Sequence, residues 1–266
     1  MTEVHRDATE EERAAWARAC NDVAEQMKAH TRPFIVPLSL ESAEEVRHVG
    51  TGSLIEAGGQ TLLITCRHVA VEGELNYSFA GTDEVFRGPE LTASPSIDAA
   101  AGRLLSSDWT ASSHSAQLVH WERIAEAHEA SVREELFFFH GFAGENSHYG
   151  FSTLVSSASG YVTQQAADAV PDDRIFELLW EPEKTTMVAA TTEEARKTMR
   201  FSNAGGFSGS LVWNTRYMDA RQRKQVWSPD DTVVCGLLIR WDTGTKTLLV
   251  TRIEHVRAWL QSAFGV

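Results

Sequence analysis

A serine flanked by glycines is the feature of this sequence that most directly suggests chemistry. Ser208 lies between Gly206 and Gly209, just before the apolar segment 211–213. Small neighbours allow a substrate carbonyl to approach the backbone closely. The backbone N–H groups of Gly206 and Ser208 would then face a developing oxyanion, where each donor is worth ~3 kcal/mol of transition-state stabilisation. The pattern predicts a serine nucleophile, with a glycine-rich surface turn as the alternative interpretation.

A serine nucleophile needs a general base, and the base needs an acidic residue to orient it. His68 follows the apolar run 62–66, where a predicted strand breaks into a short polar turn. Asp98 begins a run of small and apolar residues, and a carboxylate buried there would hold a neutral imidazole in the required tautomer. Three other acids have more polar surroundings and stay open as rivals of Asp98: Asp83, Glu84 and Asp108.

The chain begins with a predicted helix that occupies most of residues 1–32. Thr9 is placed to cap this helix, and glutamates at 10–12 fill its first turn, where the helix dipole favours negative charge. Its apolar residues recur at three- and four-residue spacing: Trp16, Cys20, Val23 and Met27. This apolar face packs either on the body of the same chain or on a partner, and both options stay open.

From residue 34 onward the apolar residues form short runs cut by glycine and proline, which is typical of β-strands. Gly58-Gly59 predicts a tight hairpin turn. Many short strands separated by turns favour an all-β barrel or sandwich. Residues 118–134 have a helical pattern and would join two halves. Residues 253–263 predict a C-terminal helix with one apolar face: Ile253, Val256, Leu260 and Ala263.

The order His68, Asp98, Ser208 resembles that of the trypsin-like (chymotrypsin-fold) serine peptidases. Six segments resemble, in order, an early family strand, the strand and turn of the catalytic histidine, the aspartate segment, the opening strand of the second barrel, the nucleophile motif and the strand after it. They are residues 50–55, 63–69, 98–104, 137–142, 206–212 and 233–239. Their shared order, over most of the chain from about residue 35, carries the resemblance.

The resemblance implies an all-β fold of two six-stranded antiparallel β-barrels with the catalytic residues in the cleft between them. The implied boundaries are an N-terminal helical extension over 1–32 and a peptidase domain over 33–266. Within that domain the first barrel covers about 33–117, a linker 118–134, the second barrel 135–252 and a C-terminal helix 253–263.

The resemblance also implies roles for individual residues. Ser208 would be the nucleophile, His68 the general base and acid, and Asp98 the orienting carboxylate. The backbone N–H groups of Gly206 and Ser208 would form the oxyanion hole. The expected partner is a protein or peptide substrate, and neither a cofactor nor a metal ion is implied.

The sequence departs from the family pattern beside the nucleophile. Phe207 stands where enzymes activated by N-terminal cleavage have an aspartate that pairs with the new α-amino group. Phe207 cannot form that pair, which argues against zymogen activation of that kind. Ser210 replaces a glycine and Leu211 a proline, and the run 99–101 is all alanine where larger apolar residues are usual.

Specificity is harder to read from the sequence. The family's pocket-floor position, six residues before the nucleophile, falls on the uncharged Ser202 and argues against a pocket for arginine or lysine. Asp242 near the pocket wall would instead favour basic side chains. Residues 180–199 form either a substrate-selecting lid or an exposed connection.

Composition sets the remaining expectations. The 266 residues include 24 basic and 37 acidic side chains, a formal net charge of −13, which lacks the basic footprint of nucleic-acid binding. No apolar run is long enough to span a membrane. The charged N-terminus and the three scattered cysteines predict a cytoplasmic protein, similar to intracellular bacterial members of the family. Substrate restriction, a masking loop or a regulatory partner protein would each restrain such a peptidase.

Three functions compete at this point. The first is a serine endopeptidase that works through an acyl-enzyme. The second is a peptidase-fold module with little or no catalysis that binds peptides or a partner protein, motivated by Phe207 and the alanine-rich run 99–101. The third is a metalloenzyme using His140 and His148, although no tight ligand pattern is present.

Overall fold

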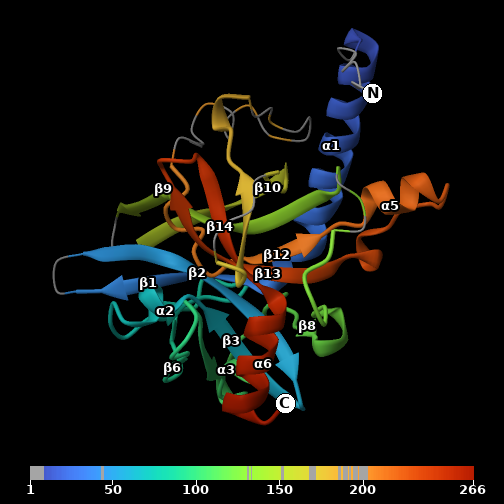
Figure 1. Cartoon of the computed structure of the whole chain (residues 1–266). Helices are drawn as coiled ribbons and strands as arrows, with labels where there is room; N and C mark the ends of the chain where they lie inside the picture. The colour runs from blue at the N-terminus through green and yellow to red at the C-terminus, as the bar shows by residue number, and fades with distance from the viewer. Residues whose placement is uncertain are drawn as a thin grey trace.

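The computed structural model describes residues 9–42, 45–130, 132, 134–150, 153–167, 172–184, 187, 191, 193, 197 and 203–266. These residues form two curled sheets, with a long helix near the N-terminus and a shorter helix at the C-terminal end (Figure 1). The predicted all-β body and both predicted terminal helices are confirmed. Among the helices described, none combines the length and the apolar character needed to cross a membrane.

The first sheet contains the strands that precede the linker. They are β1 (Ile35–Glu41), β2 (Val46–Ala57), β3 (Gln60–Thr65), β4 (Asn76–Tyr77), β5 (Phe86–Arg87), β6 (Thr92–Ala93), β7 (Ala100–Arg103) and β8 (Val119–His120). Seven are hydrogen-bonded in the order β5-β4-β1-β2-β3-β7-β6, and β8 pairs in parallel with β2. The described part of this sheet therefore has more strands than the expected six, because two-residue ladders extend it. The β2–β3 turn is the predicted hairpin, with positive φ at Gly58 and Gly59.

The second sheet has six strands, as predicted. They are β9 (Leu136–Gly150), β10 (Thr153–Gln164), β11 (Ile175–Leu179), β12 (Leu211–Asn214), β13 (Val233–Asp242) and β14 (Thr247–Arg252), in the order β10-β9-β12-β13-β14-β11. The short helices are η1 (Arg32–Phe34), α2 (Arg67–Ala70), α3 (Ser106–Ala111), η2 (Trp121–Arg123), η3 (Pro182–Lys184), α5 (Tyr217–Gln222) and η4 (Pro229–Asp231). The predicted nucleophile lies just before β12, in the middle of this sheet.

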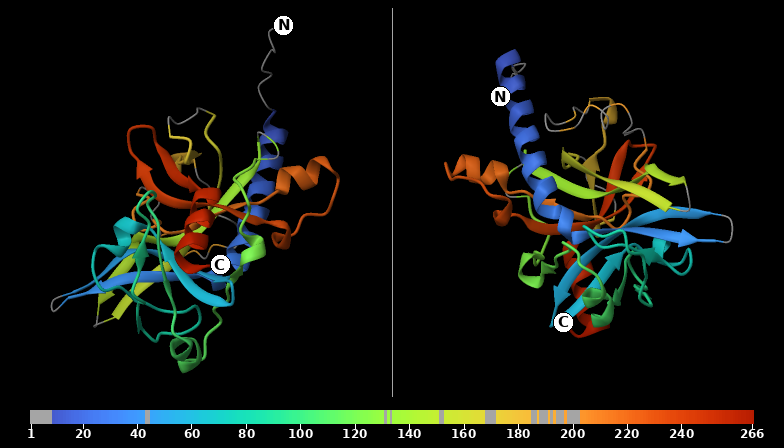
Figure 2. Two further views of the ribbon diagram at one scale, coloured as in Figure 1. Left: turned by 60° about the horizontal axis from the view of Figure 1, so that its bottom comes forward. Right: turned by 180° about the vertical axis from the view of Figure 1, so that it is seen from behind.

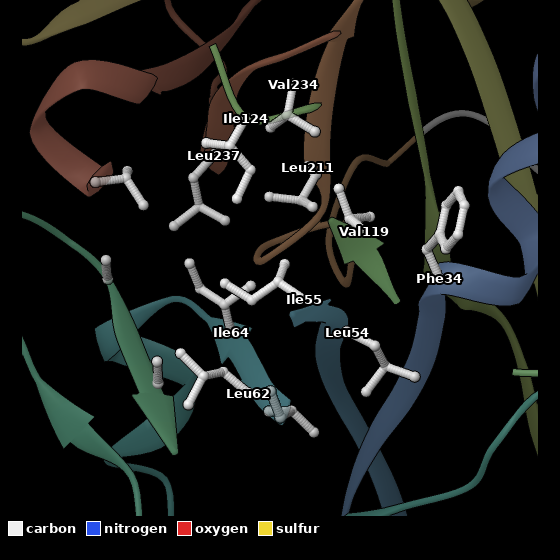
Figure 3. Close-up of a cluster of buried hydrophobic side chains, with 14 of the residues drawn as sticks. Phe34, Leu54, Ile55, Leu62, Ile64, Val119, Ile124, Leu211, Val234 and Leu237 are labelled. Atoms are coloured by element: carbon white, nitrogen blue, oxygen red, sulfur yellow. The ribbon is translucent and has the colours of Figure 1, made fainter. Parts of the chain in front are cut away.

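The main hydrophobic core lies between the two sheets (Figure 3). Leu54 and Ile64 come from the first sheet, and Leu211 and Leu237 come from the second. All four side chains are buried, and burial of an aliphatic side chain stabilises the folded state by roughly 1.5–3 kcal/mol. The sheets are thus joined through a shared core, which fixes the turns at their common boundary relative to one another.

Helix α1 (Glu10–Thr31) packs on the second sheet and projects beyond it at its N-terminal end (Figure 2). Val23 and Met27 are fully buried, and Trp16 and Cys20 pack against the same core. The predicted apolar face therefore docks within the chain. Thr9 caps the helix through a reciprocal pair of hydrogen bonds with Glu12, as its position in the sequence predicted.

Replacing Thr9 by alanine is expected to destabilise α1 by about 1 kcal/mol, because the Glu12 amide loses its side-chain acceptor. Amide hydrogen exchange over the first two turns of α1 measures the effect. Thr9→Ser keeps the hydroxyl and is expected to retain the protection of the parent. Equal exchange in the alanine and serine variants would contradict the assigned cap.

The described residues of the linker 118–134 form no helix beyond the single turn η2, contrary to the sequence prediction. Val119 lies in the parallel pairing of β8 with β2, and Ile124 forms a bridge with Val234 of β13. Both Val119 and Ile124 are buried in the main core (Figure 3). An extended chain rises about 3.3 Å per residue against 1.5 Å for a helix, so it can reach from one sheet to the other. Tertiary burial thus overrides the local helical pattern.

Helix α6 (Ile253–Phe264) closes the chain as predicted, with one correction to its apolar face. Ile253, Val256 and Leu260 are buried, but Ala263 is exposed and Phe264 is buried instead. The larger apolar side chain takes the core position because it removes more apolar surface from water.

Candidate active site

His68 is presented at the end of a buried strand. β3 ends at Thr65, Cys66 follows, and His68 occupies the first turn of α2. Val69 anchors that turn in the core, whereas the His68 side chain is 48% exposed. The imidazole is therefore held by a rigid strand end and still reachable by a substrate.

Asp98 lies beside His68 because β7 pairs with β3. The register places Ala100 opposite Thr65, so the residues just before β7 lie alongside the turn that follows β3. The carboxylate Oδ2 of Asp98 is 2.7 Å from His68 Nδ1, and its Oδ1 accepts a hydrogen bond of 3.0 Å from the His68 backbone N–H. The aspartate thus fixes both the ring and the main chain of His68.

The pKa of the Asp98 carboxyl is lowered in the folded protein. Burial acts to raise it, but hydrogen bonds from the His68 side chain and backbone outweigh that effect. A lowered native pKa means that this interaction stabilises the fold above the pKa of the unfolded chain and is lost as the pH falls through the native value. At neutral pH the carboxylate is charged and holds the Nδ1–H tautomer of His68, which leaves Nε2 as an acceptor.

The predicted rivals of Asp98 are placed elsewhere. Asp108 lies in α3 and accepts a hydrogen bond from the Tyr77 hydroxyl, while Asp83 and Glu84 are exposed. Asp242 ends β13, where its Oδ1 accepts the N–H groups of Gly244 and Thr245 in the β13–β14 turn. Ser202 and most of the segment 180–199 lie outside the described residues.

The nucleophile turn is built on two glycines with positive φ. Gly206 has φ +96° and Gly209 has φ +94°, a region that other residues rarely adopt. A Cβ atom at position 209 would collide with the carbonyl oxygen of Thr51 and the hydroxyl of Thr65. Both glycines of the nucleophile turn are thus required by the backbone conformation, and Gly209 is also required by the close approach of β2 and β3.

The N–H groups of Gly206 and Ser208 belong to peptides whose carbonyl oxygens are held elsewhere. The carbonyl of Gly205 accepts from Gly144, and that of Phe207 accepts from Ser210. Because a trans peptide directs its N–H opposite to its C=O, both N–H groups point away from those partners. Within the described part of the chain neither donates to a protein acceptor, so both are available to a ligand oxygen.

The turns that carry His68 and Ser208 meet at β13. The carbonyl of Leu238 accepts from the Gly209 N–H at 2.9 Å and from the Cys66 thiol at 3.2 Å. One acceptor is therefore shared by the residue after Ser208 and the residue two before His68. The turn that carries Ser208 therefore lies next to the turn that carries His68, which is itself hydrogen-bonded to Asp98.

The Ser208 hydroxyl has a different partner from the one the sequence predicts. It donates to the carbonyl of Ile239 at 3.0 Å, and among the hydrogen bonds of the described residues none joins it to His68. Serine side chains rotate between staggered conformers on a fast timescale. The hydroxyl must leave the Ile239 carbonyl before it can donate to the imidazole.

Cys66, His68 and Asp98 place three potential metal-ligand atoms within 4.8 Å of one another, in the part of the chain that the structure describes. Burial, with the nearby charge of Asp98, raises the pKa of the Cys66 thiol well above its usual value. Because a metal ligand must be a thiolate, a thiol that donates to Leu238 is a poor one. His140 is buried, and its Nδ1 lies 2.9 Å from the Thr31 hydroxyl oxygen. The side chain of His148 lies outside the described residues.

Thr51 and His48 contact the nucleophile turn and were not singled out by the sequence analysis. The Thr51 hydroxyl donates to the Gly206 carbonyl, and His48 Nε2 lies 2.9 Å from the Phe142 carbonyl beside it. A threonine between two glycines in a buried strand was the one available signal for Thr51.

Comparison with known proteins supports the fold alone. No protein-family model matches the chain. No curated protein matches its sequence. Human heparin binding protein is similar in structure, with a TM-score of 0.53 at 11% identity over 88% of this chain and 93% of that one. Mouse neuropsin, a serine protease expressed in the limbic system, gives a TM-score of 0.51 at 12% identity over 88% and 95%. The chain therefore has the chymotrypsin-like fold.

Proposed function

We propose that the chain is a serine endopeptidase in which Ser208 is the nucleophile, His68 the general base and acid, and Asp98 the orienting carboxylate. The observation that carries this proposal is the double contact of Asp98 with the ring and backbone of His68, at the boundary where the Ser208 turn lies. The N–H groups of Gly206 and Ser208, which have no acceptor among the described residues, would supply the matching oxyanion hole. The alternative interpretation, a glycine-rich surface turn, does not account for a paired histidine and aspartate beside Ser208.

In the proposed reaction, Ser208 Oγ forms a bond to the carbonyl carbon of the substrate while its proton passes to His68 Nε2. The carbonyl oxygen becomes an oxyanion that accepts hydrogen bonds from Gly206 and Ser208. His68 then gives the proton to the leaving nitrogen as the C–N bond breaks. A water molecule, deprotonated by His68, releases the acyl group and restores the Ser208 hydroxyl.

A second function, a peptidase-fold module that binds a peptide or protein with little catalysis, is favoured by one observation. The Ser208 hydroxyl is paired with Ile239 rather than with His68. The fold does not decide between the two, because it is similar both to a protein named for heparin binding and to one named as a serine protease. The chemical reactivity of Ser208 distinguishes the peptidase from the binding module.

Labelling with a fluorophosphonate probe tests the proposal without a known substrate, since the probe reacts with a serine only when a base and an oxyanion site activate it. The parent is expected to be labelled at Ser208, identified by peptide mass spectrometry, and Ser208→Ala is expected to lose all labelling. Ser210→Ala is the matched control, because Ser210 lies in the same turn but its hydroxyl is buried. A folded parent without labelling would reject the peptidase and leave the binding module.

A further inference from the structure

Strand β2 holds the nucleophile turn through the carbonyl oxygens of that turn. The backbone N–H of Thr51 donates to the Ser208 carbonyl at 2.9 Å, and the Thr51 hydroxyl donates to the Gly206 carbonyl at 2.9 Å. The Ser53 hydroxyl donates to the Gly209 carbonyl at 3.2 Å. Two residues of one strand thus bind three carbonyls of the turn that carries Ser208.

The Thr51 hydroxyl also connects the turn to the second sheet. Its oxygen accepts a hydrogen bond of 3.0 Å from the Phe142 N–H of β9, and its O–H donates to the Gly206 carbonyl. Thr51 is fully buried, so water cannot replace either partner. One hydroxyl therefore links β2, β9 and the nucleophile turn, and the accepted Phe142 bond directs its O–H toward Gly206.

His48 supports the same contact from the other side. Nε2 faces the carbonyls of Phe142 and Gly206, which only accept, so Nε2 carries the proton. Burial lowers the pKa of His48, although these two carbonyls act to raise it, and Nδ1 has no partner among the described residues. The ring therefore stays neutral and donates in a fixed direction.

These contacts matter because the peptides around Gly206 have little intrinsic preference. Glycine adopts positive and negative φ with similar ease, so a Gly205-Gly206 pair can reverse a peptide at low cost. Reversal would turn the Gly206 N–H away from a bound carbonyl oxygen. External hydrogen bonds decide the orientation of these peptides. The Gly144 N–H holds the Gly205 carbonyl, in the peptide that carries the Gly206 N–H, and the Thr51 hydroxyl holds the Gly206 carbonyl, in the next peptide.

We infer that Thr51 is a positioning residue: its hydroxyl fixes the Gly206–Phe207 peptide, which lies between the two peptides that carry the Gly206 and Ser208 N–H groups, and thereby keeps both N–H groups aimed at the reacting carbonyl. The inference deepens the proposed function and rests on it for its catalytic consequence. Thr51 itself touches no substrate and acts through the turn.

The pair Thr51→Val and Thr51→Ser tests this inference. Valine keeps the shape but removes both hydrogen bonds, and serine restores the hydroxyl. Thr51→Val is expected to lower the second-order rate constant of fluorophosphonate labelling by about tenfold to a hundredfold, short of the full loss of an oxyanion donor. Thr51→Ser is expected to stay within about threefold of the parent.

Thr215→Val is the matched control for lost stability. Thr215 is also fully buried and its hydroxyl donates to Leu136 at 2.8 Å, but it does not contact the nucleophile turn. At a temperature where all variants are folded, Thr215→Val is expected to be labelled at the parental rate. A rate lowered equally in Thr51→Val and Thr215→Val would reduce Thr51 to a structural role and overturn the inference.

Amide hydrogen exchange gives a readout that does not depend on activity. Thr51→Val is expected to speed exchange of the Phe207 and Ser210 N–H groups, which bond within the turn, while Thr51→Ser and Thr215→Val are not. If the parent is not labelled at all, the proposed function fails, and this exchange still decides whether Thr51 holds the turn. Parental exchange in Thr51→Val would overturn the inference.

Discussion

Replacing Asp98 by asparagine is expected to lower the rate constant of fluorophosphonate labelling by about 10³–10⁴-fold and leave the fold intact. The reason is the division of labour between the two carboxylate oxygens. Oδ1 accepts the His68 backbone N–H and Oδ2 faces the ring Nδ1. An asparagine keeps its carbonyl oxygen toward the backbone donor and turns its amide N–H₂ toward Nδ1. The ring proton must then move to Nε2, which can no longer accept the Ser208 proton.

The measurement compares labelling rates of the parent, Asp98→Asn and Asp83→Asn at pH 7. Asp83 is an exposed acid, and its substitution by asparagine is expected to leave the labelling rate unchanged. Retained labelling in Asp98→Asn would show that another group orients His68. Circular dichroism of the variants confirms that a lost rate does not come from a lost fold.

The sequence placed His68 at the end of a predicted strand and Asp98 before a run of small residues, with three other acids left open. The family resemblance selected Asp98, and the structure supplies the physical reason, because the two residues flank strands that are adjacent in the sheet. Adjacent strands with a fixed register bring their ends together. The position of the glycines in the nucleophile turn was predictable for a local reason, their positive φ.

The hydrogen-bond partners of the turn could not be predicted in the same way. Thr51 and Gly206 are 155 positions apart, and their contact depends on how the two sheets pack. The Ser208 hydroxyl donates to the carbonyl of Ile239, a residue 31 positions away, and this contact also depends on tertiary packing. The predicted helix over residues 118–134 was wrong for a related reason, because burial of Val119 and Ile124 in the core overrides the local helical spacing of the apolar residues.

Replacing Phe207 by alanine is expected to destabilise the protein by about 3–5 kcal/mol and to lower the labelling rate of the molecules that remain folded. Phe207 is 1% exposed and packs edge-on against Phe139, with ring centroids 5.2 Å apart, and against Trp180 at 6.1 Å. It stands between the two residues whose N–H groups form the proposed oxyanion hole. Removing the ring leaves a cavity beneath the turn and frees the glycine peptides to reorient.

Phe79→Ala separates these two effects. Phe79 is 2% exposed and packs against Tyr77 of β4, Phe86 of β5 and Trp109 of α3. Urea denaturation is expected to show a comparable loss of stability in both variants, whereas labelling per folded molecule falls only in Phe207→Ala. Phe207→Leu, which nearly conserves volume, is expected to lose about 1 kcal/mol and keep most of the rate.

The outcome bears on how the turn is formed. An aromatic side chain anchored in a core needs no freed α-amino group as a partner, so the turn can be in place as soon as the chain folds. If Phe207→Ala loses stability but is labelled at the parental rate, the hydrogen bonds from β2 alone hold the turn. If the labelling rate of Phe207→Ala falls while that of Phe79→Ala does not, core packing at position 207 holds the turn in place, as an ion pair does in enzymes activated by cleavage.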